Sequence, residues 1–399
     1  MNFKAGERLA SGGFLNYLII AGEASGDLHG SKLVSALKAR SPEAGFKGMG
    51  GAKMREAGVD TLFGIERMGA VGIVEVLGDF GHYYKVYRTL MREIASRSYD
   101  ALILIDYPTL NLRLAKQGRR FGCPVFFFIS PQIWAWRKGR IKEIRESVSK
   151  MFVILPFEEK LYLDAGVDAE FLGHPFVDHV QPSRSREESQ IKYSLDSKVK
   201  TIGLLPGSRM NEIDSLLNVM VEAAEKIRNE LGDCQFLLPV ANSIDPVILK
   251  QRLGTNPLGI KLIEGEPYDV MNSCDMLIIA SGSATLEAGM LGCPMVIIYK
   301  LNRLTYWLAK LLVDAPLVGL VNIVAEEEVA KELIQDKVTV ENISAEVLAV
   351  LQNPEKGKAI RERLLKIKNT LGRPGVMEAV AKRIADYMDK YRDNEKTPV

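Results

Sequence analysis

Acidic side chains occupy a glycine-containing segment near the start of the chain. The segment Ala21–Asp27 follows the apolar run Tyr17–Gly22 and contains Glu23, Ser25 and Asp27. Because acids beside a helix N-terminus would repel a pyrophosphate, this loop favours a hydroxylated or amine-bearing substrate with the two carboxylates as acceptors. The alternative for Asp27 is that it caps the helix that follows.

A further carboxylate, Asp106, follows the apolar run 102–105. Asn111 lies five residues beyond it and is a candidate for the acceptor side of the site, as are Ser25 and Asp27. At the carboxyl end of a strand, a carboxylate projects into a crevice with partly desolvated surroundings. Such surroundings raise its pKa and suit it to act as a general base. Capping of the following turn is the alternative. The sequence therefore predicts Asp106 and Glu23 as catalytic residues, without deciding which of them takes the proton.

Two turns in the second half of the chain favour phosphate binding. In the first, Ser208 and Arg209 follow the apolar run Thr201–Leu205, and a long helix is expected to start after them. Helix N-terminal amides and a guanidinium favour a phosphate or diphosphate. The second turn also joins a strand to a helix, and its candidate nucleotide-binding residues are Ser281, Gly282, Ser283 and Glu287. Backbone amides at the second turn can hold another phosphate, and Glu287 could accept hydrogen bonds from a ribose hydroxyl pair.

Aromatic and basic residues are combined in the segment 130–140. Trp134 and Trp136 lie two residues apart, and the cations that follow are Arg137, Lys138 and Arg140. Tryptophan rings next to cationic groups suit a membrane interface or an anionic lipid headgroup. Base stacking with phosphate contacts and two core aromatics beside a basic helix are the alternatives.

The net charge of the 399-residue chain is only +2, but residues 85–150 contain fourteen Lys/Arg and five Asp/Glu. This block carries +9 and the remainder −7, so the block would attract an anionic surface or a phosphorylated substrate. A solvated basic helix face is the alternative. Three segments are candidates for membrane contact: 68–77, 134–142 and 301–313.

Other chemistries find little support in the sequence. The four histidines and four cysteines are scattered, and no Asp-x-Asp pair exists to hold a metal–diphosphate complex. We therefore expect no metal and no cofactor, with Arg209 and helix dipoles neutralising a diphosphate. No run reaches the ~18 apolar residues of a membrane span. Without a recognisable signal peptide or disulfide framework, the expected compartment is the cytoplasm.

Short apolar runs alternate with amphipathic stretches along the whole chain, which predicts an α/β protein with two Rossmann-like, doubly wound domains. In this fold class ligands bind at the carboxyl ends of the strands, so the active site is expected in the cleft between the domains. The expected parts are an extension (1–15), an N-terminal acceptor-side domain (16–180), a linker (181–198), a C-terminal donor-binding domain (199–344) and C-terminal helices (345–399).

Taken in order, seven motifs resemble those of the lipid-A-disaccharide synthase family, over residues 17–386. The matching blocks are 21–27, 71–76, 130–137, 155–158, 173–175, 205–209 and 331–335. The sequence departs from the family pattern at Ser283, Val321 and Glu326, where threonine, proline and glycine are usual. The last two departures affect the loop near Asn322.

The resemblance implies an inverting glycosyltransferase of the GT-B type in lipid A and lipopolysaccharide biosynthesis. Its substrates would be UDP-2,3-diacylglucosamine and 2,3-diacylglucosamine 1-phosphate, and its products the β-1,6-linked disaccharide 1-phosphate and UDP. The resemblance adds Asn322, Glu332 and Gln335 to the donor side. It also implies a homodimer, no nucleic-acid partner, and peripheral association with the cytoplasmic face of the inner membrane.

Two alternatives remain open from the sequence. One is a different GT-B enzyme that uses a soluble UDP-sugar, such as a UDP-N-acetylglucosamine 2-epimerase, which needs no lipid-facing surface. The other is a non-enzymatic lipid- or nucleotide-binding protein, which would not need Asp106 and Glu23.

Overall fold

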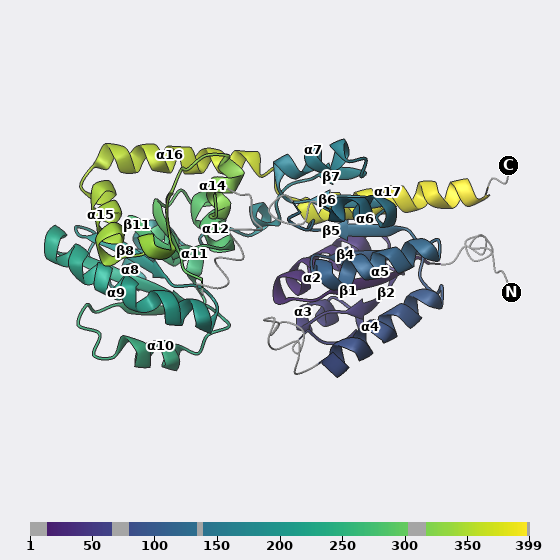
Figure 1. The fold of residues 1–399 in the computed structure, drawn as a ribbon, viewed down its shortest axis with the longest axis horizontal. Coiled ribbons are helices and arrows are strands. Elements are labelled where there is room, and N and C mark those ends of the chain that lie inside the picture. Colours follow the sequence, from purple (N-terminus) through teal and green to yellow (C-terminus); the bar gives the residue numbers. More distant parts are fainter. Residues whose placement is uncertain (1–13, 66–79, 134–138, 302–316, 397–399) are drawn as a thin grey trace. The chain divides into compact units, whose positions relative to one another are not determined.

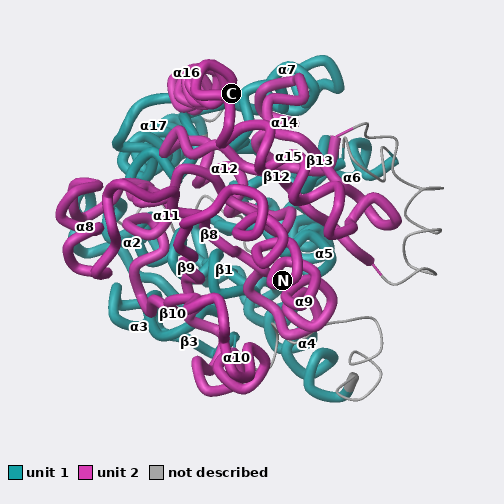
Figure 2. Tube along the Cα trace, turned by 90° about the vertical axis from the view of Figure 1, so that its left-hand side faces the viewer, with its two compact units in different colours: residues 1–178, 372–399 teal, residues 179–371 magenta. Residues whose placement is uncertain are grey.

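The computed structural model describes residues 14–65, 80–133, 139–301 and 317–396. The chain divides into two compact units (Figure 2), which are treated separately below. Unit 1 comprises residues 1–178 and 372–399, and unit 2 comprises residues 179–371.

Unit 1 is built on a seven-stranded parallel sheet with the strand order β3-β2-β1-β4-β5-β6-β7 (Figure 1). Its strands are β1 (Asn16–Ala21), β2 (Gly45–Met49), β3 (Asp60–Phe63), β4 (Ala101–Ile105), β5 (Val125–Phe128), β6 (Lys150–Val153) and β7 (Ala169–Phe171). Its helices are α2 (Ala24–Arg40), α3 (Ala52–Glu56), α4 (Phe80–Ala95), α5 (Pro108–Arg120), α6 (Arg140–Ser147), α7 (Pro156–Asp164), the 3₁₀ turn η1 (Pro175–Asp178) and α17 (Val376–Lys396).

Helices cover both faces of this sheet. On one face, α2, α3 and α17 form an apolar core with every second residue of β1 and β4. On the other face, α4, α5 and α6 form a second apolar core with the alternate residues of the same two strands. Since both faces are covered, every residue of β4 is buried, which explains why this strand is a continuous apolar run without alternation.

Unit 2 contains a six-stranded parallel sheet with the order β10-β9-β8-β11-β12-β13. Its strands are β8 (Lys200–Leu205), β9 (Cys234–Val240), β10 (Lys261–Glu264), β11 (Met276–Ala280), β12 (Met295–Tyr299) and β13 (Lys331–Ile334). Its helices are α8 (Arg186–Lys192), α9 (Met210–Leu231), α10 (Pro246–Leu253), α11 (Pro267–Ser273), α12 (Ser283–Met290), α14 (Leu320–Ala325), the 3₁₀ turn η2 (Gln335–Lys337), α15 (Val340–Leu351) and α16 (Pro354–Thr370). The prediction of two doubly wound α/β domains with a helical C-terminal segment is confirmed.

The segments expected as a linker and as C-terminal helices are both built into the two units. The segment expected as a linker contains α8, and the buried Asp269 of unit 2 accepts hydrogen bonds from the amides of Ser183 and Arg184. The C-terminal helices do not form one part: α15 and α16 belong to unit 2, whereas α17 packs along α2 in unit 1. The local reason is Asp178, whose carboxylate accepts from the Gly375 amide where α17 begins.

Candidate active site

The predicted catalytic residues lie at the topological switch point of unit 1. The strand order reverses between β1 and β4, which are direct neighbours although 80 residues separate them. Glu23 follows β1 and Asp106 follows β4, so both stand at the carboxyl edge of the sheet. In open α/β sheets, ligands bind at this point. The fold therefore brings together two residues that the sequence analysis selected independently.

The environment of Asp106 suits a general base. Burial and, to a smaller extent, the Glu23 carboxylate raise the pKa of Asp106 to about 6, against the opposing effect of a hydrogen bond from the Tyr107 amide. Glu23 is exposed and precedes α2 as its N-cap residue, yet its side chain makes no capping hydrogen bond. The two carboxylates are therefore close enough to interact, and Asp106 is the more desolvated of them.

The backbone around Asp106 is strained. Asp106 and Tyr107 have φ values of 47° and 46°, and Ile129, at the end of neighbouring β5, has φ 66°. Non-glycine residues in this left-handed region carry a cost and are concentrated at functional sites. The Tyr107 ring lies directly over Gly22, so a β-carbon there would collide with it. No local sequence signal identified Tyr107 or Ile129, because tyrosine and isoleucine normally avoid positive φ.

Two of the predicted acceptor-side residues hold the loops of unit 1 together. Asp27 is buried in the first turn of α2, and its Oδ1 accepts from the amides of Gly51 and Met54 at 2.7 and 3.0 Å. It therefore caps α3, whereas the sequence alternative was a cap on its own helix. Asn111 is fully buried and donates to the carbonyl oxygens of Ile105 and Asp106. Ser25, in contrast, is exposed at the start of α2.

Part of the aromatic–basic segment lies outside the described residues, including Trp134, Trp136, Arg137 and Lys138. The candidate membrane segment 68–77 and nearly all of 301–313 lie outside them as well. Arg140 is described and begins α6. The remaining cations of the basic block gather on the α4–α5–α6 layer, where the exposed ones are Lys85, Arg88, Arg92, Arg113, Lys116, Arg119, Arg120, Lys142 and Arg145.

The two predicted phosphate turns of unit 2 also lie at a switch point. Its strand order reverses between β8 and β11; Ser208 and Arg209 follow β8, and Ser281, Gly282 and Ser283 follow β11. The Arg209 guanidinium is 74% exposed, and Glu212 Oε1 accepts from its Nη1 at 3.3 Å. Glu212 Oε2 also accepts from the amides of Ser208 and Arg209 at 2.9 and 3.3 Å. A carboxylate that the sequence analysis did not assign therefore shapes this turn.

Glu287 is partly buried on α12 and accepts a hydrogen bond from the Tyr268 hydroxyl of α11 at 2.9 Å. Burial raises the pKa of Glu287, and this hydrogen bond opposes the rise. Ser281 donates through its hydroxyl to the Val318 carbonyl, while Ser283 and Gly282 are exposed at the start of α12.

The three donor-side residues implied by the resemblance are engaged within unit 2. Asn322 is fully buried and donates to Glu332 Oε1, which also accepts from the Gly319 amide before α14. Gln335 binds both the amide and the carbonyl of Leu301, at the end of β12. These side chains order the backbone on either side of residues 302–316.

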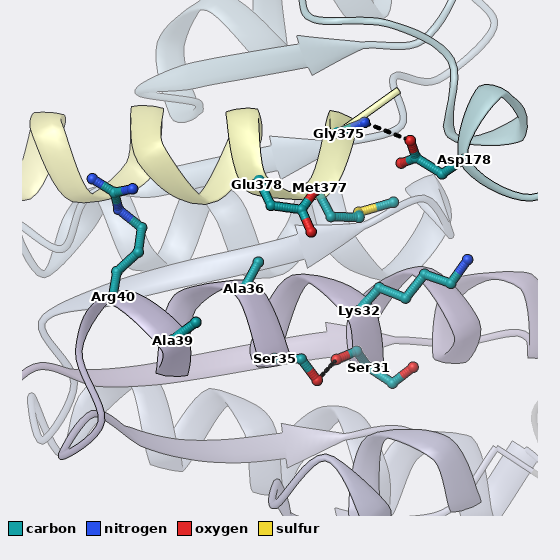
Figure 3. A pocket seen from close by; sticks show the side chains of 10 residues that line it. All are labelled: Ser31, Lys32, Ser35, Ala36, Ala39, Arg40, Asp178, Gly375, Met377 and Glu378. Atoms are coloured by element: carbon teal, nitrogen blue, oxygen red, sulfur yellow. Dashed lines mark hydrogen bonds between the residues drawn. The ribbon is translucent and has the colours of Figure 1, made fainter. Parts of the chain in front are cut away.

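A surface pocket of unit 1 lies elsewhere, along α2 and the first turn of α17 (Figure 3). Its charged lining is mixed in sign, with Lys32 and Arg40 facing Asp178 and Glu378. None of the predicted site residues lines it, and its charges match no single ligand class.

The described ranges hold neither a metal-binding cluster nor a helix that could span a membrane. They contain no group of three or more His, Cys, Asp or Glu placed to bind a metal ion. Within them, no helix is both long and apolar enough to cross a membrane.

The chain has two parallel-sheet units, and the predicted site residues lie at the switch point of each sheet. This architecture is that of the GT-B class. Solved structures support this fold. UDP-GlcNAc 2-epimerase from Neisseria meningitidis, bound to UDP-GlcNAc, has a TM-score of 0.61 at 11% identity, covering 94% of this chain and 99% of that one. CalG4, the calicheamicin glycosyltransferase, has a TM-score of 0.58 at 14% identity, covering 95% and 98%.

The chain belongs to the lipid-A-disaccharide synthase family. The family model described as lipid-A-disaccharide synthetase matches residues 17–382. A lipid-A-disaccharide synthase from Syntrophus aciditrophicus is 45% identical over 365 residues, which are 91% of this chain and 95% of that protein. One from Geobacter metallireducens is 44% identical over 375 residues, or 94% and 98%. The resemblance found in the sequence is thus confirmed, and with it the glycosyltransferase class.

Proposed function

We propose that this chain transfers the diacylglucosamine group of UDP-2,3-diacylglucosamine to the 6-hydroxyl of 2,3-diacylglucosamine 1-phosphate, with inversion, and releases UDP. The observation that carries this proposal is membership of the family over nearly the whole chain. It is supported by the desolvated Asp106 beside Glu23 at one switch point, by Arg209 after β8, and by Glu287 in α12, the helix that follows β11.

In this reaction Asp106 takes the proton from the acceptor hydroxyl as that oxygen attacks the anomeric carbon of the donor. The bond from the anomeric carbon to the UDP oxygen breaks, and the leaving diphosphate keeps the electron pair. The charge that develops on the diphosphate is stabilised by Arg209 and by helix N-termini. Glu23 orients the acceptor, and its charge adds to the burial that raises the Asp106 pKa to about 6.

Release of UDP from acylated and non-acylated donors tests this function. We expect rapid release only with the diacylated donor and the diacylated acceptor phosphate together. Turnover of soluble UDP-N-acetylglucosamine alone would favour the epimerase-like alternative, and UDP binding without release from any donor would favour a binding protein.

We also propose that the α4–α5–α6 layer meets the anionic surface of the inner membrane from its cytoplasmic side, where acylated substrates reside. The exposed cations of α5 support this proposal, since Lys116, Arg119 and Arg120 lie within five residues of one another. Attraction to anionic lipid contributes about 1 kcal/mol per basic residue near the surface. Dimerisation, which the family resemblance implies, is part of the same proposal but carries no step of the chemistry.

The protein should sediment with anionic liposomes at low salt and be released at high salt, because salt screens surface charge. Replacing Arg137, Lys138 and Arg140 together by serine should weaken sedimentation without lowering the unfolding temperature. A charge-matched control replaces three exposed lysines of α16 by serine, Lys358, Lys366 and Lys368. Equal weakening by both triple variants, or no sedimentation at any salt concentration, would contradict this docking surface.

A further inference from the structure

Tyr268 forms a hydrogen bond with Glu287, the residue that is proposed to bind the ribose of the donor nucleotide. Its hydroxyl donates to Glu287 Oε1 at 2.9 Å, from the first turn of α11 to the middle of α12. An ionised carboxylate offers about four acceptor positions, so one hydrogen bond from tyrosine leaves capacity for two ligand hydroxyls. The bond fixes the rotation of the carboxylate and thereby the direction of Oε2.

Residues before and after Tyr268 in the sequence form hydrogen bonds and ion pairs that hold the start of α11 in place. Before this tyrosine, Glu266 accepts from Arg184 Nη1 at 3.0 Å and also pairs with Lys192. After it, the buried Asp269 accepts from the Ser183 amide at 2.8 Å and from the Ser183 hydroxyl at 2.6 Å. Because these contacts immobilise the first turn of α11, the tyrosine hydroxyl can act as a fixed point for Glu287.

The protonation state of Glu287 gives a second reason for a hydrogen-bond donor such as the Tyr268 hydroxyl beside this carboxyl group. Burial raises the Glu287 pKa and favours the neutral acid, in which one carboxyl oxygen carries a proton and donates a hydrogen bond. The Tyr268 hydrogen bond stabilises the ionised carboxylate, and in this form both oxygens can accept hydrogen bonds from ligand hydroxyl groups.

We propose that Tyr268 is a positioning residue that sets Glu287 to bind the vicinal 2′- and 3′-hydroxyls of the nucleotide ribose. This inference rests on the proposed function, in which unit 2 binds a UDP-sugar. Tyr268 itself does not touch the nucleotide. Its removal should therefore change how well the site distinguishes ribose from a sugar without these hydroxyls, with little effect on kcat.

The experiment compares binding of UDP and 2′,3′-dideoxy-UDP to the full chain by calorimetry. The wild type should prefer UDP by about tenfold or more, the scale of charged hydrogen bonds to a ligand. Tyr268→Phe should reduce this preference about threefold to tenfold and leave dideoxy-UDP binding unchanged. In a Glu287→Gln background, Tyr268→Phe should have little further effect, since the two residues act through one interaction.

Tyr193 provides the matched control, because its hydroxyl donates to Glu266 Oε2 at the same distance of 2.9 Å. Tyr193→Phe should keep the wild-type preference for UDP. The positioning role is overturned if Tyr268→Phe keeps the full preference while Glu287→Gln loses it, or if Tyr268→Phe weakens both nucleotides equally. A wild type that binds both nucleotides equally well also overturns it, whereas failure to bind UDP at all refutes the proposed function as well.

Discussion

Asp106→Asn should fold like the wild type and lose at least about 10²-fold in turnover, which is the usual scale for a general base. The substitution keeps the shape of the side chain but removes the carboxylate that takes the proton. Because this carboxylate is desolvated and its pKa is raised to about 6, asparagine should cost the fold little. Initial rates of UDP release at saturating substrates measure the loss.

Glu23→Gln is the matched comparison, since it neutralises the carboxylate that faces Asp106. With its neighbouring charge removed, the Asp106 pKa should fall, so the acidic limb of the rate profile should move to lower pH. Near-normal turnover of Asp106→Asn, together with a large loss in Glu23→Gln, would transfer the role of base to Glu23.

The pH dependence of the wild type follows from the same carboxylate. Since the base acts in its ionised form, kcat/KM should be constant above pH 7 and fall about tenfold per pH unit well below pH 6. A profile that stays flat down to pH 4.5 would contradict proton transfer to a carboxylate with a raised pKa.

Arg209→Ala should weaken UDP binding by about 1.5–3 kcal/mol, the contribution of a charged hydrogen bond, or roughly 10- to 150-fold in Kd. The guanidinium is 74% exposed, so it is available to a diphosphate, and Glu212 holds it beside the start of α9. Because the guanidinium end of this ion pair is exposed to solvent, the substitution should leave the unfolding temperature nearly unchanged. Titration calorimetry with UDP measures the effect.

Arg252→Ala is the control for Arg209→Ala, because Arg252 is a half-exposed arginine of unit 2 that, like Arg209, is paired with a carboxylate, in this case that of Asp214. We expect it to bind UDP like the wild type. A chelator should leave activity intact if Arg209 and helix dipoles neutralise the diphosphate, and strict dependence on magnesium or manganese would refute this arrangement.

The turns that contain the predicted site residues could be found from the sequence because each is defined by a few consecutive residues. A buried parallel strand must be a continuous apolar run, and its end is marked by the first glycine or polar residue. The apolar runs Tyr17–Gly22 and Thr201–Leu205 therefore agree with β1 and β8 to within one residue at each end. β3 was missed because Asp60–Phe63 is short, begins with an acid and is not fully buried.

The sequence by itself determined the α/β class, the family and the turns that are predicted to bind ligands, since these depend on residue types at fixed local spacing. The tertiary structure decided which turns meet: β1 pairs with β4 across 80 residues, and this pairing places Glu23 near Asp106. It also turned Asp27 toward α3 and brought Tyr268 to Glu287. Such partners are chosen only when distant segments pack, because a buried polar group must take whichever donor or acceptor the fold brings within reach.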